Sequence, residues 1–281
     1  MTQTDTAQTA DNLALATDIE SWLRDRLSES GAKRFVLGLS GGIDSALVCG
    51  LAVRAVGSDK VLGTIMPSSS VSADAELASD VAGTFGVQTI IVDLTEPTNA
   101  LKGVLSSVED VLATSEVPHN VEPTTLDLDS HEGATPGQLA EANLKPRLRM
   151  TTNYYIANLC GGVVLGTGNK TEAMIGYFTK YGDGGVDLLP IVDLYKHEVR
   201  EMARVIGVPD TVIQRPPSAG LWEGQTDEDE IGLTYEELDA TLLAIASGNT
   251  ENSNPATLEK VRSMVAGSQH KRAPVPAFRR G

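Results

Sequence analysis

Two hydroxyls, two glycines and a carboxylate fall within residues 40–45, between two apolar segments of the chain. The backbone N–H groups of a glycine-rich turn favour phosphate, as does the positive end of the helix that follows it. The structural alternative is a tight turn in which Ser40 or Asp44 caps the helix. A plain turn does not need all of these polar groups, so the residues indicate a phosphate-binding loop.

The spacing of these glycines excludes both common nucleotide-binding loops. A Walker loop requires a lysine after its glycines, and none follows Gly41 and Gly42; the stretch GLSGGI also lacks the spacing of a dinucleotide fingerprint. The stretch SGGIDS resembles instead the S-G-G-x-D-S loop of the PP-loop ATP pyrophosphatases. The resemblance implies cleavage of ATP to AMP and pyrophosphate with activation of a carbonyl, and it leaves the substrate open.

Short segments rich in Val, Ile and Leu alternate with helical patterns along the first part of the chain. The alternation predicts an α/β fold in which an open parallel sheet carries helices on both faces. The resemblance to the PP-loop enzymes implies that this sheet has the Rossmann-like, adenine nucleotide alpha hydrolase-like arrangement. Ligands bind at the carboxyl ends of parallel strands, so the polar clusters there predict one composite site. The expected strands are 34–39, 61–66, 88–94 and 163–165; the expected helices are 43–56, 72–85 and 144–159; the polar clusters are 40–45, 67–71 and 166–172.

We expect residues 1–281 to form a single domain. Residues 1–12 lack a basic region and an apolar core, which predicts a disordered start rather than a signal peptide, and hence a cytoplasmic protein. Residues 109–138 are acidic without a sustained period and predict an exposed insertion. Residues 215–232 combine Pro, Gly and acidic residues around one Trp, which predicts a mobile lid loop. The later helical patterns are 234–245 and 255–265.

The formal net charge is −16, from 22 Lys and Arg residues against 38 Asp and Glu residues. This excess argues against a nucleic-acid partner and an anionic membrane surface, because both attract clustered Lys and Arg. It fits either plain solubility or a high-salt cytoplasm in which self-repulsion is screened. No run is long and apolar enough to span a bilayer. Cys49 and Cys160 lie in apolar segments at unrelated spacing, which predicts reduced core thiols rather than a disulfide or a metal site.

Four stretches of the second half make the resemblance closer. They are NLKPRLRM from Asn143, LGTGNKTEAMIGYFTKYGDGGVDLLPIVDLYKHEVR from Leu165, PPSAGLWEGQTDEDEIGLTYEELD from Pro216 and HKR from His270. In this order and spacing they resemble the ammonia-dependent NAD synthetases, over about residues 18–278. The resemblance implies adenylation of nicotinate adenine dinucleotide (deamido-NAD) by ATP, followed by attack of ammonia to give NAD and AMP. It also implies a homodimer with the dinucleotide near the subunit interface.

The resemblance further implies roles for particular residues. Asp44, Glu172 and Lys196 are the implied catalytic residues, and Asp44 and Glu172 are the implied ligands of a Mg²⁺ ion that accompanies ATP. Without the resemblance, Glu172 is more simply a first-turn acid that stabilises a helix dipole. The implied ATP contacts are Gly38, Leu39, Ser40, Gly41, Gly42, Ile43, Asp44, Ser45, Thr167, Lys196 and Ser218. The implied deamido-NAD contacts are Arg147, Lys180, Asp187, His270 and Lys271.

Two other functions stay open from the residues alone. One is a different PP-loop reaction, either GMP synthetase-like amidation or tRNA thiolation, and the other is nucleotide binding without catalysis. The acidic composition disfavours tRNA, and a passive adenine-binding module does not need the acid pair Asp44 and Glu172. The expected nitrogen donor is ammonia itself, because the two cysteines lie in core segments and the sequence leaves no room for an amidase domain; a separate glutaminase partner stays open.

Pro146 departs from the family pattern, which commonly has Ala at this position. It is tolerable in the first turn of a helix that Asn143 caps.

Overall fold

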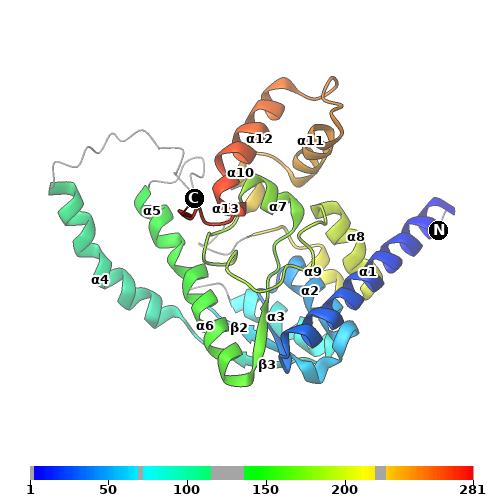
Figure 1. The fold of residues 1–281 in the computed structure, drawn as a ribbon, viewed down its shortest axis with the longest axis horizontal. Helices are drawn as coiled ribbons and strands as arrows, with labels where there is room; N and C mark the ends of the chain where they lie inside the picture. The colour runs from blue at the N-terminus through cyan, green and yellow to red at the C-terminus, as the bar shows by residue number, and fades with distance from the viewer. Residues whose placement is uncertain (1–2, 69–71, 115–135, 219–225, 281) are drawn as a thin grey trace.

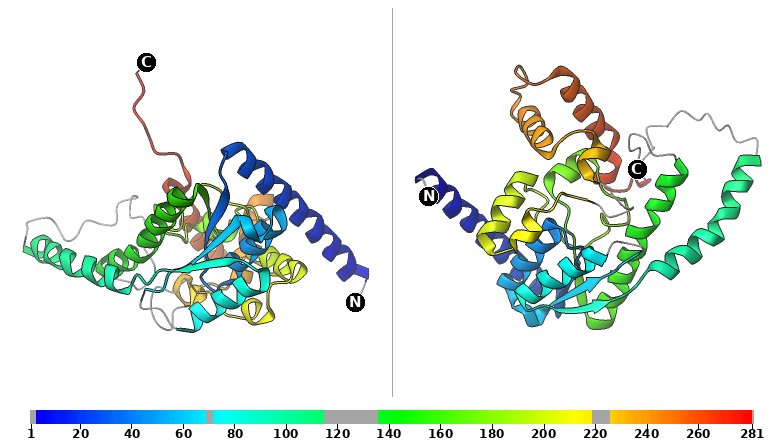
Figure 2. Two further views of the ribbon diagram at one scale, coloured as in Figure 1. Left: turned by 90° about the horizontal axis from the view of Figure 1, so that it is seen from below. Right: turned by 180° about the vertical axis from the view of Figure 1, so that it is seen from behind.

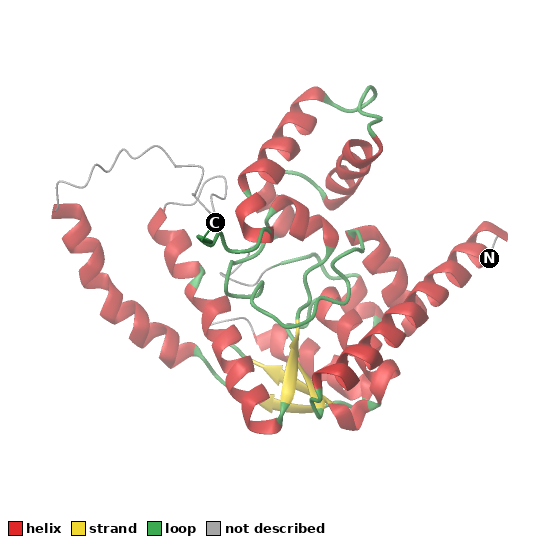
Figure 3. Ribbon diagram, viewed as in Figure 1, coloured by secondary structure: helices red, strands yellow, loops and turns green. Residues whose placement is uncertain are grey.

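A four-stranded parallel sheet lies in the lower half of the view in Figure 3. The computed structural model describes residues 3–68, 72–114, 136–218 and 226–280. The strands are β1 (Arg34–Gly38), β2 (Val61–Ile65), β3 (Gln88–Ile91) and β4 (Gly162–Leu165), and their order across the sheet is β3-β2-β1-β4. All three strand pairs are parallel, so the carboxyl ends of β1, β2 and β4 lie at one edge of the sheet, where the polar clusters begin.

Helices cover both faces of this sheet, which confirms the predicted fold class (Figures 1 and 2). On one face Phe35 and Leu37 of β1 pack in the main core with buried residues of α1 (Gln3–Ser30), α2 (Ile43–Val56), α3 (Ser72–Phe85) and α8 (Lys196–Ile206). On the other face Val36 of β1 packs with Ile156 and Ala157 of α6 (Leu144–Cys160). Successive side chains of a strand point to opposite faces, so one apolar strand serves both layers.

The helices expected at 43–56 and 72–85 are confirmed without change as α2 and α3. Those expected near 144, 234 and 255 are confirmed as α6, α11 (Tyr235–Ser247) and α12 (Pro255–Gly267). The third expected strand is shorter than predicted, because β3 ends at Ile91. Helices α11 and α12 pack with α7 (Lys170–Ile175) and α10 (Asp227–Ile231) around a separate apolar cluster centred on Tyr235.

The disordered start expected for residues 1–12 is wrong from Gln3 onward, because α1 begins there. Ala16, Leu23 and Leu27 form the buried face of this helix and pack into the main core. Further toward its start, the side chain of Asn12 donates a 3.2 Å hydrogen bond to Glu201 on α8. A polar contact to a distant helix leaves no hydrophobic periodicity in the sequence, which is why the pattern did not predict this segment.

Both loop predictions also need correction at their ends. The structure describes helix α4 (Thr95–Thr114) and helix α5 (Pro136–Ala142) at the two ends of the expected insertion 109–138, and residues 115–135 lie outside the described residues. Lys102 and Glu141 join α4 to α5 through a 2.6 Å ion pair. Within the expected lid 215–232, α10 is helical and residues 219–225 lie outside the described part.

Three short helices complete the described chain: η1 (Ser58–Lys60), α9 (Asp210–Ile213) and α13 (Gln269–Arg272). None of the helices in the described ranges is long and apolar enough to cross a membrane.

Candidate active site

The loop between β1 and α2 is held by its own hydroxyls. Ser45 Oγ donates to Gly42 O at 3.0 Å, and it accepts from Ser40 N at 3.3 Å. Ser40 Oγ in turn accepts from Gly42 N at 3.2 Å. Gly42 is the N-cap of α2 and no side chain caps this helix, so the alternative in which Ser40 or Asp44 is a simple helix cap is wrong.

Position 41 requires glycine for two reasons, its backbone conformation and the lack of space for a side chain. Its φ is +78°, and a Cβ atom there would lie 2.6 Å from the backbone oxygen of Asp74 on α3. We expect Gly41→Ala to lower the free energy of unfolding by about 1–3 kcal/mol and to weaken ATP binding, because the loop must move away from α3. Denaturant unfolding and ATP calorimetry measure the two effects.

The matched control is Gly83→Ala in α3, where an added Cβ meets nothing within 4 Å. This control is expected to be neutral or slightly stabilising. Equal stabilities of the two variants would contradict the strain assigned to Gly41.

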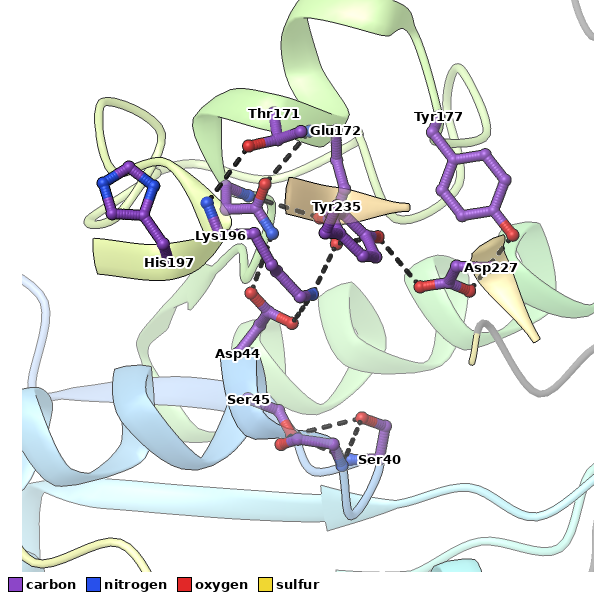
Figure 4. A network of polar contacts seen from close by, with 12 residues as sticks. Ser40, Asp44, Ser45, Thr171, Glu172, Tyr177, Lys196, His197, Asp227 and Tyr235 are labelled. Atoms are coloured by element: carbon purple, nitrogen blue, oxygen red, sulfur yellow. Dashed lines mark hydrogen bonds and ion pairs between the residues drawn. The ribbon is translucent and has the colours of Figure 1, made fainter. Parts of the chain in front are cut away.

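Asp44, Glu172 and Lys196 come together from three helices, α2, α7 and α8 (Figure 4). Lys196 Nζ lies 2.6 Å from Asp44 Oδ2 and 3.0 Å from Glu172 Oε1, and only 2% of its side-chain surface is exposed. Asn169 links the two acids: its Nδ2 donates to Asp44 at 2.9 Å, and its Oδ1 accepts from the backbone N–H of Glu172 at 3.0 Å. Glu172 is the N3 residue of a capping box on α7, so it combines the first-turn role with membership of the charged cluster.

The charges of this cluster shift one another's pKa values. The pKa of Glu172 is raised to about 7. Burial is the largest cause, the nearby charge of Lys196 lowers the pKa, and the charges of Asp44 and Asp227 raise it. Burial lowers the pKa of Lys196, but Asp44 and Glu172 outweigh it and the net pKa lies above the ordinary value. At neutral pH the cluster therefore holds a charged lysine beside a glutamate that is close to its midpoint.

This shift predicts a pH dependence of stability. Because the folded-state pKa of Glu172 is raised above its ordinary value of 4.5, the stabilising contribution of this group is present below pH 4.5 and is lost as pH rises through about 7. The free energy of unfolding of the unmodified chain, relative to Glu172→Gln, should fall by about 3 kcal/mol between about pH 5 and about pH 8.5. Urea titrations of both proteins across this range measure it, and a difference that does not change with pH contradicts it.

A second acidic group adjoins the cluster. Tyr235 OH lies 2.9 Å from Asp227 Oδ2 and 3.3 Å from Glu172 Oε1, and its ring lies under Lys196 Nζ with 4.7 Å to the centroid. Tyr177 OH donates to Glu230 at 2.8 Å and lies 3.1 Å from Asp227. Burial is the main cause that raises the pKa of Asp227 and of Tyr235. The sequence predicted none of these residues for the site.

A buried carboxylate behind the cluster ties together the helices that carry it. Asp239 on α11 accepts from Thr171 Oγ1, and it accepts from the backbone N–H of His197 at 2.9 Å. The ring Nδ1 of His197 also lies 2.9 Å from Asp239 Oδ2. Thr171 precedes Glu172 and His197 follows Lys196, so Asp239 fixes the separation of the acid and the lysine.

A cavity of about 300 Å³ opens over the loop and the charged cluster. Thr167, Lys196 and Ser218 line it together with the loop, so the structure brings together the residues expected to contact ATP. Gly41 is absent from the lining and packs against α3 instead. Two further lining residues that the sequence did not single out are Arg149 and Asp183.

The residues expected to contact the dinucleotide do not line this cavity. Arg147 donates to the backbone oxygen of Lys180 at 3.5 Å, and Lys180 Nζ donates to that of His270 at 2.9 Å. Lys271 Nζ donates to the backbone oxygens of Gly176 and Phe178, both at 2.9 Å. These four residues form one continuous group beside the site.

Asp187, the fifth residue of the set, lies apart from the other four. Its carboxylate accepts from Tyr154 OH at 2.9 Å and from the backbone N–H of Val164 at 2.8 Å.

The helix that carries Arg147 begins differently from the expectation. Asn143 precedes α6, but it makes no capping hydrogen bond with its side chain. Its Oδ1 accepts from Thr179 Oγ1 instead, which ties the start of α6 to the loop after α7. Pro146 is buried in the first turn, where its missing N–H costs nothing.

Neither cysteine is bridged; Cys49 is a core residue as predicted, whereas Cys160 is only partly buried, so its prediction as a core thiol is wrong. Cys49 is buried in α2, and burial raises the pKa of its thiol to about 12. A thiol in that state is a poor nucleophile.

A glycine-rich loop after the first strand of a parallel sheet, facing an acid pair and a buried lysine, defines a nucleotide site of the α/β class. The chain belongs to the NAD synthase family, whose model matches residues 15–275. It is 44% identical over 260 residues to the NH(3)-dependent NAD(+) synthetase of Archaeoglobus fulgidus, covering 92% of this chain and 93% of that protein. It is 38% identical over 270 residues to the enzyme of the same description from Halobacterium salinarum, covering 92% and 90%.

Solved structures of similar proteins share the fold. NMN synthetase from Francisella tularensis superposes with a TM-score of 0.78 at 31% identity, covering 95% of this chain and 99% of that one. The NH3-dependent NAD synthetase from Campylobacter jejuni, in complex with the nitrate ion, gives a TM-score of 0.73 at 22% identity, with 95% and 99% covered. The second likeness bears on the fold alone.

Proposed function

We propose that this chain makes NAD from deamido-NAD, ATP and ammonia; its Archaeoglobus fulgidus relative is named an NH(3)-dependent NAD(+) synthetase. The observation that carries the proposal is the convergence of Asp44, Glu172 and Lys196 on the glycine-rich loop in one cavity. In the first step a carboxylate oxygen of deamido-NAD bonds to the α-phosphorus of ATP, and the bond to the β-phosphate breaks so that pyrophosphate leaves. In the second, ammonia bonds to the acyl carbon and loses a proton while AMP leaves.

The residues fit roles in the first step. The N–H groups and hydroxyls of the loop 40–45 suit the triphosphate, and the buried ammonium of Lys196 offsets the charge that builds on the leaving pyrophosphate. The structural support is that Ser40, Gly42, Ser45 and Lys196 line the same cavity. For the group of Arg147, Lys180, His270 and Lys271 we propose contact with the dinucleotide, since its cations lie beside that cavity.

Asp44 and Glu172 would hold the Mg²⁺ ion. Among the described residues no group of three or more His, Cys, Asp or Glu is arranged for a metal, but Mg²⁺ in nucleotide sites needs only one or two carboxylates plus phosphate oxygens. These two carboxylates already share one cationic neighbour, Lys196, so they converge on a common point. When bound, the ion would neutralise charge on the phosphates.

The nitrogen donor is proposed to be ammonia. Support comes from the names of the Archaeoglobus fulgidus and Halobacterium salinarum relatives, both of which are NH(3)-dependent NAD(+) synthetases. Neither cysteine suits an amidase, because Cys49 is buried and Cys160 makes only a 3.7 Å contact to a carbonyl within its own helix.

The deciding experiment supplies purified protein with ATP, Mg²⁺ and deamido-NAD plus either ammonium or glutamine, and it assays NAD and AMP. Formation of NAD from ammonium supports the proposal; equal formation from glutamine, without contaminating glutaminase, overturns the choice of donor.

A parallel arm replaces deamido-NAD by the corresponding mononucleotide acid, because of the likeness to NMN synthetase. The cytoplasmic location stays a prediction for cell fractionation to test.

We propose a homodimer, because large apolar side chains are exposed on helices α4 and α6, which contact each other. Figures 1 and 2 show both helices. Val104 on α4 and Leu159 on α6 are 71% and 72% exposed, and Tyr155, one turn before Leu159, is also exposed. A double variant, Val104→Asp with Leu159→Asp, should therefore elute as a monomer in size exclusion with light scattering. Val275→Asp in the C-terminal tail, at an equally apolar exposed position, is the control, and a dimeric double variant contradicts the interface.

A further inference from the structure

Among the residues that the structure describes, three basic side chains line the main cavity: Arg149, Lys196 and Arg215. Two of them are neutralised by the protein itself. Lys196 lies between Asp44 and Glu172, and Arg215 forms an ion pair with Asp74. Within the ranges that the structure describes, Arg149 is the lining cation with no carboxylate within ion-pair distance.

Arg149 lies on α6 and is partly buried. Its Nε donates to the backbone oxygen of Met66, at the carboxyl end of β2, with a distance of 3.2 Å. Burial lowers its pKa, while the more distant Asp183 and Asp74 raise it, and a guanidinium keeps its charge under such shifts. A partly desolvated cation without a counter-ion is costly for the fold, and an anion that enters the cavity offsets that cost.

The arginine two residues earlier does not share this position. Arg147 donates to the backbone oxygen of Lys180 and does not line the cavity. The cavity itself is acidic, because its lining carboxylates outnumber its cations. They are Asp44, Asp74, Glu172, Asp183, Asp227 and Glu230. Two anionic reactants that meet in such a cavity need a cation that the protein has not already neutralised.

We infer that Arg149 binds an anionic oxygen of the reacting groups, either the α-phosphate of ATP or the carboxylate of deamido-NAD. This inference rests on the proposed function. A planar guanidinium whose Nε is anchored on Met66 can present its remaining N–H groups as a fixed fork, which suits carboxylate and phosphate oxygens. Arg149 is thereby a binding residue for the first step, distinct from the lysine and acid cluster.

The test compares Arg149→Gln and Arg149→Lys with Arg204→Gln, an exposed arginine on α8 that makes the same change of charge. Arg149→Gln should lower kcat/KM by about 100-fold, with a smaller loss in Arg149→Lys, because the charge remains but the fork is lost. Its Tm should equal or exceed that of the unmodified protein, because a partly desolvated cation without a counter-ion has been removed. A residue that serves only the fold would lose Tm and activity together.

Binding measurements identify the anion without turnover. Calorimetry with ATP alone, deamido-NAD alone and NAD alone separates the sources, because NAD carries an amide where deamido-NAD carries the carboxylate. Weaker ATP binding in Arg149→Gln assigns the phosphate, and weaker deamido-NAD binding with unchanged NAD binding assigns the carboxylate. If all three affinities stay within about twofold and kcat/KM stays within about fivefold, the inference is overturned. If the unmodified protein makes no NAD, the proposed function fails instead, and the affinities still decide the role of Arg149.

Discussion

Lys196→Met is expected to lower kcat by about 10²–10⁴-fold and the free energy of unfolding by about 3–5 kcal/mol. The ammonium lies 2.6 Å from Asp44 and 3.0 Å from Glu172, so its removal leaves two neighbouring carboxylates with no cation between them. The loss in kcat follows because the same ammonium faces the phosphates in the proposed reaction. Steady-state kinetics and denaturant unfolding measure the two effects.

Lys170→Met is the matched control for stability. Lys170 also forms an ion pair, at 2.7 Å, but its partner Asp193 is 89% exposed. An exposed pair contributes at most about 1 kcal/mol, so this variant should unfold close to the unmodified protein. If Lys196→Met lowers the free energy of unfolding no more than Lys170→Met does, the buried cluster is not a source of stability.

Asp44→Asn and Glu172→Gln should each abolish measurable turnover and the stabilisation that Mg²⁺ gives in the presence of ATP. A neutral amide keeps the shape of each side chain but is a poor ligand for a hard dication. Thermal melts with and without Mg²⁺ follow binding independently of activity, because a ligand that binds the folded state raises its apparent stability.

Asp193→Asn supplies the same chemical change at an exposed carboxylate outside the cluster. It should keep the full shift in Tm with Mg²⁺ and ATP. Near-normal turnover in either Asp44→Asn or Glu172→Gln would remove that residue from the proposed metal site.

The regular core of this fold could be predicted from local pattern alone. Helix α2 and helix α3 have the predicted ends, because an apolar face at helical spacing specifies both the element and the side that packs on the sheet. Helices α1 and α4 were not predicted, and each leaves large apolar residues exposed, among them Leu13 on α1 and Val104 on α4. Their place in the fold depends on contacts that a local pattern does not contain.

Some residues of the candidate site could be predicted from the sequence, and others could not. The resemblance predicted Asp44 and Lys196, whose contact spans 152 positions along the chain and is invisible to any local pattern. The acidic run TDEDE, by contrast, does not reveal which carboxylate turns inward: Asp227 is buried beneath Tyr235, whereas Asp229 is exposed and bonds to the N-cap Thr226. Arg147 and Arg149 present the same difficulty, because residues two apart on a helix face different directions.

The far end of α7 is closed by residues that come almost a hundred positions later. Arg272 Nη1 donates to the backbone oxygens of Ala173 and Met174 at 2.9 and 2.6 Å, and a Cβ on Gly176 would lie 2.1 Å from Ser268. The helix that bears Glu172 is therefore completed only after residues 268–272 have been synthesised. A product truncated before Ser268 lacks the groups that close this helix, so synthesis through Arg272 is a condition for an assembled site.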